Sequence, residues 1–359
     1  MKIIETTTPK EVRDFDGEYP KKLEPTDVVE IFQTPLTGSY NWDYTVQDNR
    51  IRKLYELGKE LNWNVEVDVD WSPEFKGITD EEFEFEDNQW TNHEMYKGWD
   101  TKKRKEFLHD QNAWALSQFL HGEQGALLVA SQLASCAPTF NAKLYAASQT
   151  FDEARHVEAF NKYLQTRIKT SWPIGTGLKT LLDKILTDPR WDLKFIGMQV
   201  IIEGLALAAF NASKESSRDP VYKEMIGLII RDEARHVTFG INYLHEFVKT
   251  LSEEEVLDRA KFALEACTVS RNRLRPFEVW KKYGLDLVST EEYSKENLFQ
   301  TQFQEVLFSR IMPNLKKIGL LPEEVIPGYE KLGVMKYSES DSDYELDWDE
   351  LSKPLKEAV

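Results

Sequence analysis

The distribution of apolar and polar residues divides the chain near residue 100. Residues 1–100 are acidic, rich in tryptophan and turn-forming residues, and show little long periodicity, with one helix expected near 47–62. After Lys102, apolar residues recur at helical spacing over long stretches, which predicts an all-α bundle. The expected helices cover residues 102–136, 139–169, 175–186, 190–217, 219–250, 253–283 and 290–318.

Proline positions support these boundaries. Asp188-Pro189 and Asp219-Pro220 each have the form of an N-cap followed by a first helical turn. We expect three regions: an irregular N-terminal segment packing on the bundle (1–100), a helical domain (101–335) and an acidic, flexible tail (336–359). The prolines that fall in the predicted gaps are Pro138, Pro173, Pro189 and Pro220.

Composition and charge narrow the range of functions. The 359-residue chain has a formal net charge of −17, which argues against a basic surface for nucleic acid. Its two cysteines, Cys136 and Cys267, lack ligand spacing and predict neither a disulfide framework nor an iron–sulfur site. Neither a signal-peptide core nor an uninterrupted apolar stretch of about 20 residues is visible. We therefore expect a cytoplasmic protein without a membrane span.

One pentapeptide, Asp-Glu-Ala-Arg-His, occurs twice, at residues 152–156 and 232–236. Positions i and i+3 share a helix face, so Glu153 can converge with His156 and Glu233 with His236. A Glu-x-x-His pair on each of two helices, with one glutamate from each of two others, is how a helix bundle holds two metal ions.

Two further glutamates complete this pattern. Glu123 lies 30 residues before Glu153, and Glu203 lies 30 residues before Glu233. Each interval fits an antiparallel helical hairpin that brings its two carboxylates to similar depth. Both glutamates stand in apolar runs, where a carboxylate is costly to bury unless it is paired or bound to metal. A single such motif is usually a solvated helix face, but its exact recurrence with both partners predicts a dinuclear site.

The ligand types indicate which metal would bind. Carboxylates with some imidazole suit iron and manganese, whereas zinc favours cysteine and histidine. Two iron ions are the first expectation, and a mixed Mn/Fe pair is the second. Asp152 and Asp232 are expected to accept the free ring N–H of a histidine ligand across the bundle, with Arg155 and Arg235 balancing their charge.

Residues 105–250 resemble the ferritin-like di-iron carboxylate superfamily, in its oxygen-activating branch, through the order Glu, Glu-x-x-His, Glu, Glu-x-x-His. The paired Asp-Glu-x-Arg-His motifs are most similar to multicomponent monooxygenase hydroxylase subunits, and residues 51–72 resemble the region before the bundle in ribonucleotide reductase small subunits and related oxidases. The resemblance implies a ferritin-like four-helix bundle with additional helices. The implied metal ligands are Glu123, Glu153, His156, Glu203, Glu233 and His236.

The chain departs from each well-known subfamily, including the acyl-carrier desaturases, whose motifs differ around each histidine. The radical tyrosine of reductase small subunits would lie four residues after the first ligand histidine, where this chain has Phe160. Monooxygenases carry a threonine where Leu207 stands, and arylamine N-oxygenases add a histidine where Ile229 stands. The subfamily therefore remains open.

The resemblance implies an O2-dependent oxidoreductase of monooxygenase type. Such an enzyme would oxidise a small hydrophobic molecule by hydroxylation, N-oxygenation or desaturation. It would need an external electron donor, a reductase or a ferredoxin, and a homodimer is expected from chains of this type. A radical-generating reductase subunit or Mn/Fe protein is the alternative, followed by a ferroxidase or peroxide scavenger. Apolar residues at helical spacing near the ligands could line a substrate pocket or simply form core: Phe119, Leu127, Phe160, Leu207, Phe210, Ile229 and Phe239.

Overall fold

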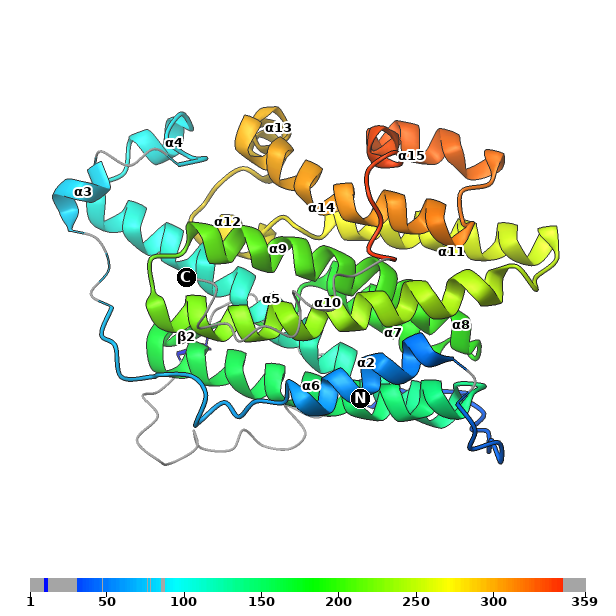
Figure 1. Cartoon of the computed structure of the whole chain (residues 1–359). Coiled ribbons are helices and arrows are strands. Elements are labelled where there is room, and N and C mark those ends of the chain that lie inside the picture. Colours follow the sequence, from blue (N-terminus) through cyan, green and yellow to red (C-terminus); the bar gives the residue numbers. More distant parts are fainter. Residues whose placement is uncertain are drawn as a thin grey trace.

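The computed structural model describes residues 10–11, 31–46, 48–75, 77, 79–84 and 88–344. Two helical hairpins form its central bundle (Figure 1). In the first, α5 (Thr101–Cys136) packs along α6 (Phe140–Tyr163). In the second, the π-helical segment η2 (Phe195–Ile202) continues into α9 (Glu203–Ser216), and both pack along α10 (Pro220–Val248). Contacts between α6 and α10 join the two hairpins.

Additional helices cover the bundle. The N-terminal helix α2 (Asn49–Glu60) lies against α6 and α10, as Figure 1 shows. On another side, α11 (Glu253–Asn272) packs on α7 (Thr176–Thr187), and α14 (Leu298–Ile318) packs on α9 and α10. The shorter elements are β1 (Lys10–Glu11), which pairs antiparallel with β2 (Thr170–Ser171), α3 (Asp80–Glu84), α4 (Glu94–Lys97), η1 (Leu164–Ile168), α8 (Trp191–Lys194), α12 (Phe277–Lys282), α13 (Leu287–Glu296), η3 (Glu323–Val325), α15 (Ile326–Leu332) and η4 (Met335–Tyr337).

Side-chain caps start the bundle helices close to the predicted positions. Asp100, Thr139 and Asp219 accept hydrogen bonds from backbone N–H groups in the first turns of α5, α6 and α10. The prediction of a cap and first turn at Asp219-Pro220 is confirmed. It is wrong for Asp188, whose carboxylate accepts from the backbone N–H of Arg190 before the next helix begins at Trp191.

Two predicted helices are interrupted. The helix expected over 253–283 ends at Asn272, and a separate short helix begins after Pro276, whose ring removes a backbone donor. The helix expected over 290–318 is divided between α13 and α14 at Asn297, which has an extended conformation with ψ of 122°. In both cases the apolar pattern continued while the backbone changed direction.

The continuous helix from Trp191 to Ser216 is long and apolar enough to cross a membrane by composition alone. In the structure, 94% of its most apolar window is buried inside the protein. It is flanked by α10, α11 and α14, which places it at the centre of the helical domain. We therefore identify it as a core helix of the bundle.

Segments before and after the long helices also pack on the helical core. After α2, the side chains of Trp63, Val65 and Val69 are buried in a cluster with residues of α6 and α10. Near the other end, the Asp343 carboxylate accepts from Arg310 and Asn314. The predicted flexible tail lies outside the described residues from position 345 onward.

Candidate metal centre

The six predicted ligand side chains meet inside the bundle. The π-helical turns of η2 lead directly into the glutamate of the second hairpin, and such irregular turns recur at functional sites. All six side chains are buried: Glu123 on α5, Glu153 and His156 on α6, Glu203 on α9, and Glu233 and His236 on α10.

One group of donor atoms surrounds the ring of His156. Its Nδ1 lies 3.1 Å from a carboxylate oxygen of Glu123, 3.3 Å from one of Glu153 and 3.1 Å from one of Glu233. The four ligand atoms lie within 4.8 Å of one another. This spacing can accommodate one metal ion.

A second group surrounds the ring of His236. Ligand atoms of Glu153, Glu203 and His236 also lie within 4.8 Å of one another. Nδ1 of His236 is 3.0 Å from Glu153 and 3.7 Å from Glu233. Glu153 and Glu233 therefore approach both histidines, whereas Glu123 and Glu203 each belong to one side.

The hydrogen bonds of the two histidine rings on the side away from the cluster indicate whether the cluster suits cations. Nε2 of His156 lies 3.2 Å from Asp232, and Nε2 of His236 lies 3.1 Å from Asp152. If each Nε2–H donates to its aspartate, each Nδ1 directs a lone pair at carboxylates. Lone pairs facing buried carboxylates repel unless a proton or a metal ion lies between them. The cluster is thus suited to a dinuclear metal site.

The pKa values of the predicted ligands also indicate a site suited to cations. Burial and neighbouring carboxylates raise the pKa of Glu123 and of Glu203 well above the usual range. Burial alone would lower the pKa of His156 and His236, but surrounding carboxylates raise it well above its usual value. These four side chains therefore favour their protonated forms, at positions where metal ions could replace the protons.

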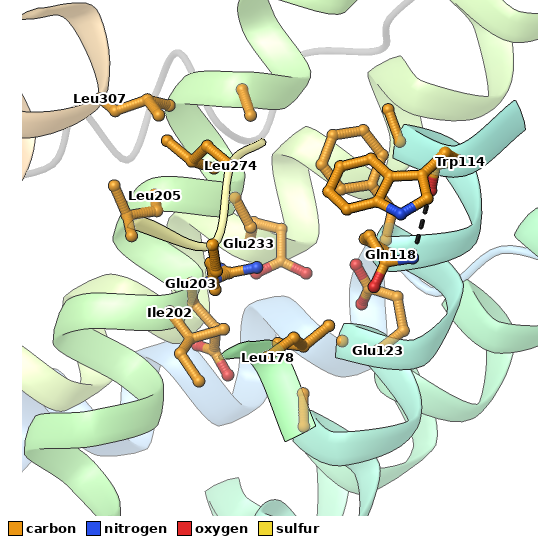
Figure 2. A pocket seen from close by; sticks show the side chains of 17 residues that line it. Trp114, Gln118, Glu123, Leu178, Ile202, Glu203, Leu205, Glu233, Leu274 and Leu307 are labelled. Carbon is orange, nitrogen blue, oxygen red and sulfur yellow. Dashed lines mark hydrogen bonds between the residues drawn. The ribbon is translucent and has the colours of Figure 1, made fainter. Parts of the chain in front are cut away.

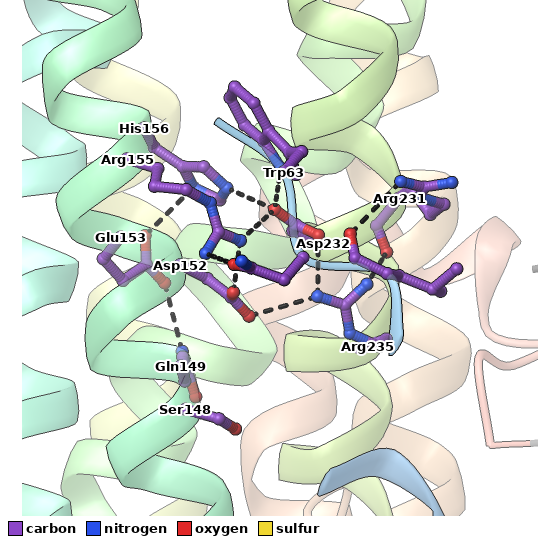
Figure 3. Close-up of polar contacts among 12 residues, drawn as sticks. Trp63, Ser148, Gln149, Asp152, Glu153, Arg155, His156, Arg231, Asp232 and Arg235 are labelled. Atoms are coloured by element: carbon purple, nitrogen blue, oxygen red, sulfur yellow. Dashed lines mark hydrogen bonds and ion pairs between the residues drawn. The ribbon is translucent and has the colours of Figure 1, made fainter. Parts of the chain in front are cut away.

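A four-membered charge network lies directly outside the histidines (Figure 3). Arg155 contacts Asp152 at 2.5 Å and Asp232 at 3.2 Å, and Arg235 contacts Asp232 at 2.6 Å and Asp152 at 3.1 Å. Burial would raise the pKa of Asp232, but the arginines and His156 hold it well below its usual range. Both aspartates thus lie within hydrogen-bonding distance of a histidine ring across the bundle.

The described part of the N-terminal segment contacts one half of this network, Arg155 and Asp232. Trp63 donates its indole N–H to Asp232 at 2.7 Å, and Arg155 donates to the side chain of Asn62 at 2.5 Å. Figure 3 shows Trp63 beside Asp232 and His156. Sequence reasoning missed these contacts, because no local pattern links residue 63 to residue 232.

Two buried glutamines were also missed. Gln149 donates to Glu153 at 3.2 Å and to Glu203 at 2.8 Å. Gln199 is fully buried in η2. Each glutamine lies four residues, about one turn, before a predicted ligand glutamate. That repeated spacing is a signal that could have found them.

An apolar cavity of about 130 Å³ opens onto the cluster from one side. Figure 2 shows Glu123, Glu203 and Glu233 on its wall, opposite Trp114 and Leu274. An apolar cavity of about 150 Å³ is large enough to hold benzene. The space therefore suits a molecule of roughly one ring.

Of the seven predicted pocket residues, Phe119 lines this cavity. A wider surface pocket of about 640 Å³ shares Ala115, Phe119 and Ala209 with the cavity, so the two spaces lie next to each other. Leu127 is partly buried on α5. The other five lie in packed clusters of the bundle: Phe160, Leu207, Phe210, Ile229 and Phe239.

No protein-family model and no curated protein matches the sequence. Two solved structures of mutants of an R2-like ligand-binding oxidase, with anaerobically and aerobically reconstituted Mn/Fe cofactor, are similar in structure. They have TM-scores of 0.50 and 0.51, with 16% and 15% identity. Each match covers 78% of this chain and 96% of the other. The fold is therefore ferritin-like, and the predicted fold class is confirmed.

Proposed function

We propose that this protein is an O2-dependent oxidoreductase whose six converging glutamates and histidines bind two metal ions. The observation that carries the proposal is the orientation of the rings, because both Nδ1 atoms face carboxylates while both Nε2 atoms face aspartates. Iron in both positions is the first choice. The Mn/Fe cofactor named for the similar structures supports a mixed pair as the second.

The side chains around the cluster would have distinct tasks. Bound metal ions would supply the redox chemistry that reduces O2 and oxidises a substrate. Glu153 and Glu233 would help hold the metal ions, since each approaches both histidines. Asp152 and Asp232 would hold each ring with its proton on Nε2.

The cavity would position a small apolar substrate and exclude water from the reaction. Its apolar wall includes Phe119, Leu178 and Leu205. Phe160 occupies the position of the reductase tyrosine and packs 5.8 Å from Phe119 and 5.7 Å from Phe210, measured between ring centroids. An all-phenylalanine cluster favours substrate oxidation over a tyrosyl-radical subunit. The electrons for O2 reduction would come from an external donor.

Metal analysis followed by anaerobic reduction and rapid mixing with O2 tests the proposal. We expect about two metal ions per chain and O2 consumption that depends on them. A candidate substrate should accelerate the reaction of the reduced centre with O2 or be recovered as an oxidised product. Less than one metal ion per chain, or O2 uptake unchanged by removing the metal, would contradict the proposal.

A further inference from the structure

Arg273 brings a positive charge to the cavity beside the predicted metal centre. It is the residue that caps the C-terminal end of α11, and its side chain lines the cavity together with Leu274. The close approach of Gly177 makes this placement possible, because a Cβ at Gly177 would lie 2.7 Å from Cβ of Arg273. Arg273 thus enters the cavity from an element outside the four-helix bundle.

Among the described residues, no carboxylate pairs with Arg273. Its Nε atom is buried and has no hydrogen-bond partner there. The loss of solvent alone lowers the pKa of Arg273 to about 10, with no contribution from a neighbouring charge. The Arg273 side chain is partly buried, and a cation that loses water without gaining a counter-ion is costly, so such a group is suited to binding an anion.

The charges of the predicted metal centre and of the network outside it would balance one another. Four ligand glutamates would neutralise two divalent metal ions. Asp152 and Asp232 are matched by Arg155 and Arg235 through the ion pairs described above. Among the described residues that line the cavity, Arg273 is the one cation, and no ion pair compensates its charge.

The remaining polar groups of the cavity wall have partners. Gln118 donates to the Pro173 carbonyl and accepts from the backbone N–H of Gly175, and Trp114 donates to Glu278. The wall therefore offers a ligand one free positive donor group and apolar surface, beside the predicted metal ligands.

We propose that the cavity binds a small organic acid whose carboxylate pairs with Arg273 and whose apolar body lies against the predicted metal centre. A guanidinium matches a carboxylate through two parallel N–H···O bonds. The cavity volume limits the apolar body to about one ring or a short chain. This inference names a substrate class for the proposed oxidoreductase and rests on that function for its chemistry, although anion binding can be measured separately.

The test compares acids with their neutral amides. Calorimetry on the full-length chain, loaded anaerobically with Fe(II), would measure binding of benzoate, phenylacetate and hexanoate against benzamide, phenylacetamide and hexanamide. At least one acid should bind about tenfold or more tightly than its amide, as expected for a charge-assisted hydrogen-bonded pair. This preference should disappear in Arg273→Gln.

Arg271→Gln is the matched control. Arg271 lies two residues before Arg273, in the last turn of α11. Its side chain donates to Gln304 and does not line the cavity. It should keep the acid preference. If no acid is preferred in the unaltered chain, or if Arg273→Gln keeps the preference because the acids bind the metal directly, the inference is overturned.

A second measurement needs no substitution. Phenylglyoxal modifies arginine, and mass spectrometry can follow its reaction at Arg273. The preferred acid should slow modification of Arg273 while its amide does not, and equal protection by both would overturn the inference.

Metal content and O2 uptake of the same samples separate the two proposals. Loss of acid preference with normal metal and O2 uptake rejects only the anion site, whereas acid preference without metal rejects only the oxidoreductase.

Discussion

The two Asp-Glu-Ala-Arg-His segments are identical in sequence, yet their surroundings differ. The side of His156 is built from regular α-helix and is contacted by Trp63 of the N-terminal segment through Asp232. The side of His236 contains the π-helical segment before Glu203 and the hydrogen bonds of Gln149. The repeat therefore specifies which groups converge, while distant and irregular segments make the two predicted metal positions chemically unequal.

The largest expected effect is on metal content, and it should distinguish a carboxylate that belongs to both groups of donor atoms from one that belongs to a single group. Glu153→Ala should remove most metal from both positions, because Glu153 belongs to both groups of donor atoms. Glu203→Ala should empty mainly the position beside His236. Metal content per chain would measure this, with about half the metal retained in Glu203→Ala. Equal metal content in the two variants would show that the positions do not share Glu153.

The next largest effect should be on stability, when one aspartate of the aspartate–arginine network loses its charge. Asp232→Asn and Asp152→Asn each leave two buried arginines sharing one aspartate, and an uncompensated buried charge costs about 3–5 kcal/mol of unfolding free energy. The loss should be greater for Asp232, since it also accepts from Trp63. Denaturant unfolding of the metal-free proteins measures both, and a larger loss in Asp152→Asn would contradict the proposed asymmetry.

Acidity should change the stability of the metal-free protein. The folded pKa values of His156 and His236 are raised, so their stabilising contribution is complete below pH 6.5 and is lost as pH rises through the folded values. Each unit of pKa difference corresponds to about 1.4 kcal/mol. Thermal unfolding at increasing pH should show falling stability without metal and a smaller fall with metal. Rising stability of the metal-free chain above pH 6.5 would contradict this.

The smallest effects on stability and metal binding should come from residues whose contacts differ between the side of His156 and the side of His236. Trp63→Phe removes one hydrogen bond to Asp232, and Gln149→Leu removes two hydrogen bonds to the carboxylates. Each should cost about 1 kcal/mol of stability per bond and weaken metal binding about tenfold. Trp71→Phe is the matched control, because its indole donates to a backbone carbonyl away from the cluster. Metal titration should find the control unchanged, and an equal loss in Trp71→Phe would indicate a general packing effect.

Local sequence signals predicted the bundle and the residues that converge in it, because helical periodicity and i, i+3 spacing act over a few turns. They did not locate the break after Asn272, where apolar residues continue on both sides of Pro276. They also could not identify Trp63 or Arg273 as neighbours of the cluster. Those two contacts depend on how segments far apart in sequence fold back, which no local pattern records.

The apolar helix from Trp191 to Ser216 has a consequence for biosynthesis. Its covering helix α14 ends at Ile318, 102 residues after Ser216. At about 5–20 residues per second, the ribosome needs roughly 5–20 s to complete that cover. During this interval the nascent chain exposes a segment with the composition of a membrane span. Co-translational protection by a chaperone, with early docking of α10, would keep newly made chains from aggregating or being misdirected to a membrane.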